Sequence, residues 1–80
     1  MKIPVIKKLV ETYATEELVK AENDIIEEQI LAINVEGEDE GEKLTHVIAA
    51  AWIQTEMREK NIEFKDALRE YTKKVRASIS

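Results

Sequence analysis

Apolar residues recur every three or four positions along most of the chain, which is the spacing of one face of an α-helix. Four segments follow this pattern, with short polar stretches between them and no internal repeat. The pattern predicts an all-α fold, a compact up-and-down bundle of four helices. The predicted helices span about residues 4–13, 16–32, 41–60 and 64–79, and residues 33–42 form one acidic loop.

Residues that favour helix ends stand near the predicted boundaries. Pro4 suits the first turn of a helix, where its missing N–H costs nothing, and Thr15 is a predicted N-cap. Asp39 followed by Glu42 has the spacing of a capping box, with Asp in place of Ser or Thr. Asn61 tolerates the left-handed conformation that ends many helices. These signals support four separate helices.

The third predicted helix is apolar on two opposite sides. One side carries Leu44, Val47, Ile48, Ala51, Trp52 and Thr55. The other carries His46, Ala49, Ala50, Ile53 and Met57. A chain of this length has little protein to cover both sides, so we expect the second side to form the interface of a homodimer or larger helical oligomer. The alternative is that the first and fourth helices enclose it within one monomer.

Length, cysteine content and charge exclude several classes of protein. Eighty residues form a single domain, 1–80. The absence of cysteine excludes disulfides and thiol chemistry and fits a cytoplasmic location. The longest apolar run, 47–53, is too short to span a membrane. The net charge is −5, and residues 11–42 hold twelve acidic residues against one basic residue, Lys20, which argues against nucleic-acid binding.

No set of residues for catalysis is visible. Serine occurs only at Ser78 and Ser80, the single histidine would have to act alone, and no glycine-rich phosphate loop is present. The sequence therefore predicts a protein that is not an enzyme and that carries no cofactor.

A metal site is the alternative function. Glu42 and His46 stand four residues apart, so both project from one side of the predicted helix, and Asp39 lies close by. The Glu-x-x-His motif of di-iron bundles does not occur, and the acidic loop does not match a calcium-binding loop. A packed histidine and a solvated acidic loop are the commoner reading of these residues.

Two polar residues fall inside the apolar stripe of the second predicted helix. They are Glu22 and Gln29, seven residues apart. A buried carboxylate needs a partner or a raised pKa, whereas long side chains at a stripe's edge can reach water. The second arrangement is favoured.

The chain resembles a family of small bacterial proteins of unknown function. The resemblance rests on the opening Met1-Lys2-Ile3-Pro4-Val5-Ile6, the second helix after Thr15, the acidic lead into the third helix and the closing Ala67-Leu68 and Lys74-Val75 pairs; residues 35–42 differ from the family pattern. The resemblance implies a helical, cytoplasmic protein and supplies no catalytic or ligand residues. Members of that family are encoded near peroxiredoxin and thioredoxin-type proteins, which makes a redox protein the first partner to test.

Together these features predict a small non-catalytic helical protein. We expect it to act in protein–protein interaction or as an accessory module, as a homo-oligomer with a dimer as the first expectation, with no membrane or nucleic-acid partner.

Overall fold

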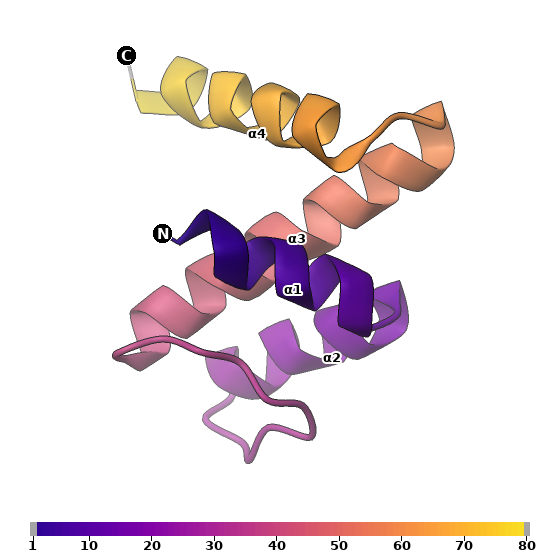
Figure 1. The fold of residues 1–80 in the computed structure, drawn as a ribbon. Coiled ribbons are helices and arrows are strands. Elements are labelled where there is room, and N and C mark those ends of the chain that lie inside the picture. The colour runs from indigo at the N-terminus through magenta and orange to yellow at the C-terminus, as the bar shows by residue number, and fades with distance from the viewer. Residues whose placement is uncertain (1, 80) are drawn as a thin grey trace.

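Four α-helices make up the regular structure of the part of the chain described by the computed structural model, residues 2–79, of which Ile79 is described by its backbone alone. The helices are α1 (Ile3–Thr12), α2 (Thr15–Ile26), α3 (Glu40–Lys60) and α4 (Phe64–Ile79) (Figure 1). No strand occurs among these residues. The predicted all-α fold with four helices is confirmed.

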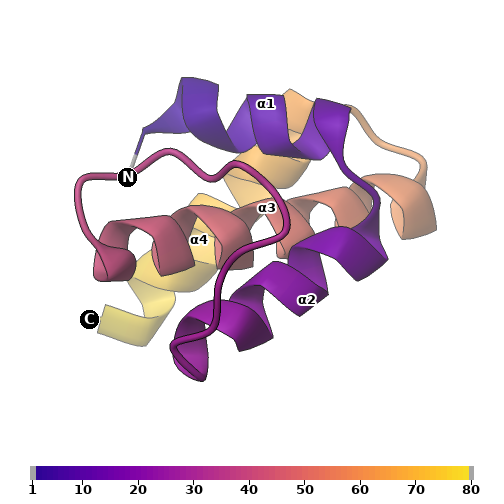
Figure 2. The ribbon, with the colours of Figure 1, turned by 90° about the horizontal axis from the view of Figure 1, so that it is seen from below.

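The longest helix, α3, is the centre of the fold. α1, α2 and α4 each pack against it, whereas no other pair of helices packs extensively. Figures 1 and 2 show α2 and α4 on different sides of α3, with α1 lying across it between them. Because α4 packs extensively on α3 alone, much of its circumference is left without a neighbour.

One continuous apolar core joins the helices. It is built around α3, and its largest fully buried apolar side chains are Ile6, Leu18, Val47 and Ile53. The other buried apolar residues are Leu9, Val10, Ala21, Ile25, Val35, Ala49, Ala50, Ala51, Ala67 and Tyr71. Burying this apolar surface is the main favourable contribution to folding.

The ends of α3 follow the predicted signals. The Asp39 carboxylate accepts a hydrogen bond from the backbone N–H of Glu42 at 2.8 Å, which satisfies one of the free N–H groups of the first turn. Asn61 ends the helix with φ 54° and ψ 48°, in the left-handed region. Both predicted boundaries of this helix are therefore explained by local hydrogen bonding and backbone geometry.

The start of α2 differs from the prediction by one residue. Ala14, rather than Thr15, is the N-cap, and its N–H donates to the Glu17 carboxylate at 3.0 Å. The Thr15 hydroxyl instead donates to the side chain of Gln54 on α3 at 2.5 Å. Thr15 therefore links two helices, a tertiary role that displaces the local capping role.

The end of α2 is the larger correction, because the helix stops at Ile26 and not near residue 32. Glu28 adopts φ 58°, and the Gln29 N–H then bonds back to the Asp24 carbonyl at 2.7 Å. This left-handed turn closes the helix as a terminal glycine would. No glycine stands there to signal the stop.

The segment after α2 runs back over the core in an extended form. Leu31, Ile33 and Val35 point inward, whereas the residues between them are exposed. Alternation of this kind has a period of two, which is typical of extended backbone and not of a helix. The acidic loop predicted for 33–42 is thus corrected at both ends: the connection spans 27–39, and residues 40–42 belong to α3.

Candidate protein-interaction surface

The side of α3 that was expected to form an interface is covered by the rest of the chain. His46, Ala49, Ala50 and Ile53 are 0% exposed, and Met57 is half-buried and packs on the core. The four buried side chains offer no surface to a second molecule. This corrects the expected site, and the alternative of enclosure within one monomer holds for these four residues.

α1 provides much of that cover, and hydrogen bonds at both of its ends hold it there. At its start, the backbone N–H of Lys2 donates to Nε2 of His46 at 3.0 Å. At its end, the Gln54 amide donates to the carbonyls of Val10 at 3.1 Å and Tyr13 at 2.6 Å. Since residues 46 and 54 lie about two turns apart on α3, these contacts hold both ends of α1 against one side of it.

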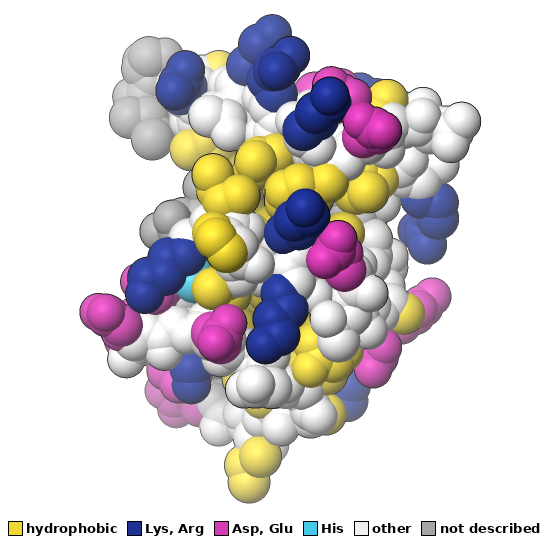
Figure 3. Space-filling model, viewed as in Figure 1, with side chains coloured by type: hydrophobic (Ala, Val, Ile, Leu, Met, Phe, Trp, Pro, Cys, Tyr) yellow, Lys and Arg dark blue, Asp and Glu magenta, His cyan; other side chains and the backbone are white. Residues whose placement is uncertain are grey.

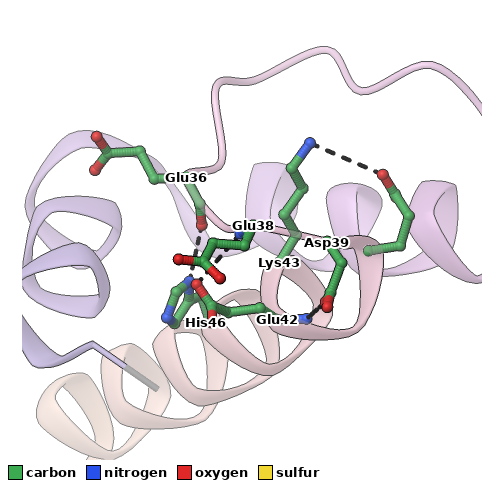
Figure 4. Close-up of polar contacts among 7 residues, drawn as sticks. Glu36, Glu38, Asp39, Glu42, Lys43 and His46 are labelled. Carbon is green, nitrogen blue, oxygen red and sulfur yellow. Dashed lines mark hydrogen bonds and ion pairs between the residues drawn. The ribbon is translucent and has the colours of Figure 1, made fainter.

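The predicted metal ligands surround the first turn of α3, where Figure 4 shows them as sticks. His46 uses both ring nitrogens within the chain, because Nδ1 lies 2.8 Å from the Glu36 carbonyl and Nε2 faces the Lys2 N–H. A backbone N–H can only donate, so Nε2 is the acceptor and Nδ1 carries the proton. Neither nitrogen has a lone pair left for a metal ion.

The nearby carboxylates stabilise the helix start. Asp39 caps α3, and the Glu42 carboxylate accepts from the Glu38 N–H at 3.3 Å (Figure 4). Lys43 approaches Glu40 at 3.8 Å. Within residues 2–79 there is no group of three or more histidine or acidic side chains that could hold a metal ion. The arrangement accounts for a backbone turn and a helix N-terminus, and it does not favour the metal-binding alternative.

The opposite side of α3 is the one that stays partly open. A groove of about 270 Å³ runs over it, lined by Glu22 of α2 and by Ile48, Ala51, Trp52, Thr55 and Glu56 of α3. Ile48 is 38% exposed and Trp52 is half-buried. Val19 and Ile26, three residues before and four after Glu22, lie on the same face of α2 and are 44% and 60% exposed. The groove is therefore mainly apolar and has an apolar border.

Trp52 forms the link between this groove and α4. Its ring lies 5.6 Å from that of Tyr71, at an angle of 54°, which is a favourable tilted arrangement of aromatic rings. The Lys74 ammonium sits 6.0 Å from the Trp52 ring centre, at the outer limit of a cation–π contact. Burial raises the pKa of the Tyr71 phenol above its ordinary value. Trp52 is thus held in place on one side and open on the other.

Carboxylates mark the polar edge of the groove. Glu56 bonds to Lys60 at 2.9 Å, and Lys60 also reaches Glu70 on α4 at 3.0 Å. The hydrogen bond that the Lys60 ammonium donates to the Glu56 carboxylate lowers the pKa of Glu56 and raises the pKa of Lys60. The Glu22 side chain is half-buried, and its carboxylate has no hydrogen-bonding or ion-pair partner within residues 2–79.

The two polar residues in the predicted stripe therefore have different positions. Glu22 lies at the edge of the core, as favoured, whereas Gln29 lies beyond the end of α2 and is exposed. The sequence contained a signal for the groove. Thr55 and Glu56 follow Trp52 by three and four positions, so polar residues share the helix face of the large Trp52 ring, which indicates that this face is not fully covered.

Comparison with known proteins places the whole chain in one family. A family model described as a family of unknown function, DUF6952, matches residues 1–80. The match agrees with the resemblance to a family of unknown function seen over nearly the full length of the chain. No curated protein and no solved structure matches the chain. Among the described residues, no helix is both long enough and apolar enough to cross a lipid bilayer.

Proposed function

The chain belongs to DUF6952, a family of unknown function, and we propose that it is a non-catalytic helical interaction module that acts as a homo-oligomer. The surface that associates is the groove over Ile48 and Trp52, not the enclosed side of α3. An accessory role toward a second cytoplasmic protein, such as a redox protein, would use the same groove.

One observation carries this proposal: the apolar groove is open although the opposite apolar side of α3 is covered. Three of the exposed large apolar residues, Val19, Ile26 and Ile48, lie in or beside it. Single exposed apolar residues are common on protein surfaces, but an apolar groove lined by a large aromatic ring is typical of an interaction site. Trp52 has the residue type most enriched among side chains that dominate binding energy.

The proposal is tested by the mass of the protein in solution. Light scattering at increasing concentration should show the wild-type chain rising above the 9.2 kDa of a monomer. Ile48→Lys should keep the mass at that of the monomer, because a charge in the groove would have to be desolvated on association.

Ile3→Lys is the matched control, since Ile3 on α1 is similarly exposed, at 48%. It should associate as the wild type does. A wild-type chain that stays monomeric at every concentration, or two variants that behave alike, would contradict the proposal.

A further inference from the structure

α4 carries a basic ridge on the side turned away from α3. Its buried residues, Ala67 and Tyr71, face the core. The opposite side holds a shallow hollow of about 390 Å³, lined by Lys65, Leu68, Arg69, Thr72, Lys73 and Arg76. Of these, Leu68 is half-buried and also packs on the core. Figure 3 shows basic side chains gathered over α4. Within residues 2–79, the side chains of Arg69 and Lys73 have no ion-pair or hydrogen-bond partner.

The charges of α2 and α4 are opposite and of equal size. α2 carries four acidic residues and one basic residue, a net charge of −3. α4 carries five basic and two acidic residues, a net charge of +3. Both surfaces also combine apolar and charged groups, because Ile48 and Trp52 lie beside the unpaired Glu22, and Leu68 lies beside Arg69.

These two surfaces cannot meet within one chain. The groove opens beside α3, and Trp52 contacts the inner face of α4 through the tilted ring of Tyr71. The ridge lies on the outer face of that same helix, about half a turn away around its axis. A contact between ridge and groove therefore requires a second molecule.

We propose that the groove of one copy receives the basic ridge of α4 from a second copy, with Arg69 placed against Glu22 and Leu68 over Trp52 and Ile48. This proposal rests on self-association through the groove and adds the element that fills it. Pairing leaves no unpaired carboxylate at the groove edge, and it buries apolar surface on both copies. Because each copy has one ridge and one groove, the same contact can form in a closed dimer or in a longer chain of copies.

An interface of this kind responds to salt and to reversal of charge. Complementary charges speed association and fix its orientation, and salt weakens them. The mass of the wild-type chain should therefore fall toward that of a monomer as salt is raised. An apolar contact alone would not weaken in that way, because salt does not screen it.

A charge swap tests the predicted pair directly. Glu22→Arg and Arg69→Glu should each raise the dissociation constant by about tenfold, the size of effect expected for one directly interacting pair. The double variant should return it to within about threefold of the wild type. Lys7→Glu on α1, an exposed residue with the same change of charge as Arg69→Glu, should have little effect. Circular dichroism confirms that each variant is folded.

The outcomes separate this proposal from the one on which it rests. Restoration in the double variant supports the ridge-in-groove contact. If Ile48→Lys prevents association but the charge swap restores nothing, the groove is the interaction site and another element fills it, so the ridge proposal is overturned. A wild-type chain that is monomeric at low salt overturns both.

Discussion

Both long sides of α3 are apolar, but only one of them is closed along its length. On the other side Val47 is buried, whereas Ile48 stays 38% exposed. On the covered side, His46, Ala49, Ala50 and Ile53 have no exposed surface, and hydrogen bonds to both ends of α1 hold the cover in place. On the other side, Ile48 and Trp52 border a groove with no helix over it.

The difference between the two sides lies in their polar residues. The covered side has His46 and Gln54, whose side chains bond to backbone groups of α1 and of the connection before α3. Thr55 and Glu56 beside the groove make no such contact: the Thr55 hydroxyl bonds within its own helix, and Glu56 pairs with Lys60. A polar side chain that bonds to the backbone of another element therefore marks the covered side better than apolar content does.

The largest expected effect on stability comes from the covered side. Ile53→Ala should lower the free energy of unfolding by about 2–5 kcal/mol, because it removes a fully buried side chain and leaves a cavity. Chemical denaturation measures the change. A loss below about 1 kcal/mol would mean that this side is not the core of the fold.

His46→Ala should be the next most destabilising change. It leaves the Lys2 N–H and the Glu36 carbonyl without their partner and opens a gap, at a cost of about 2 kcal/mol or more. Thr45→Ala, at the exposed neighbouring position, is the control and should cost far less. Nuclear magnetic resonance of the ring should show the proton on Nδ1; a proton on Nε2 would contradict the assigned hydrogen bonds.

Ile48→Lys should barely change the stability of the monomer, even though it prevents association. The residue is partly exposed, and surface substitutions of this kind usually stay within about 0.5 kcal/mol. The free energies of unfolding of Ile48→Lys and Ile53→Ala are compared by chemical denaturation, at a protein concentration low enough to keep the wild type monomeric. Equal losses for the two variants would show that the two sides of α3 do not differ.

The smallest effect is expected from Lys60→Met, at the end of α3. Lys60 lowers the pKa of Glu56, so the ionised carboxylate adds stability above the ordinary glutamate pKa. That contribution is lost as the pH falls through the lowered pKa. The variant should therefore show a flatter fall in stability on acidification, measured by denaturation at several pH values. An unchanged pH dependence would show that this exposed pair contributes nothing, as is common for surface ion pairs.

The helix boundaries of this fold could be predicted from the sequence where the conformational preference of a single residue determines them. The ends of α3 were predictable because Asp39 and Asn61 have intrinsic capping preferences. The end of α2 was not, because Glu28 takes a left-handed conformation that its residue type does not favour. The extended segment that follows was not predicted either, because Ile30 and Ala32 are apolar as well and hide the alternation of Leu31, Ile33 and Val35, which only the burial pattern shows.

The position of the candidate site depended on information that a single sequence lacks. Helical periodicity predicted correctly that α3 has two apolar sides. It does not indicate which of the other helices packs on each side. That choice depends on where α1 packs, which is set by contacts between residues more than forty positions apart in the chain, such as Gln54 with Val10.

Quenching of Trp52 fluorescence tests most directly whether the groove side of α3 is the interaction site. Trp52 is the single tryptophan of the chain and lies in the groove, so it reports on that surface without any label. Its quenching by acrylamide should be strong in dilute solution and should weaken as the protein is concentrated, in step with the rise in mass. Quenching that stays constant while the mass rises would mean that the chains associate through another surface.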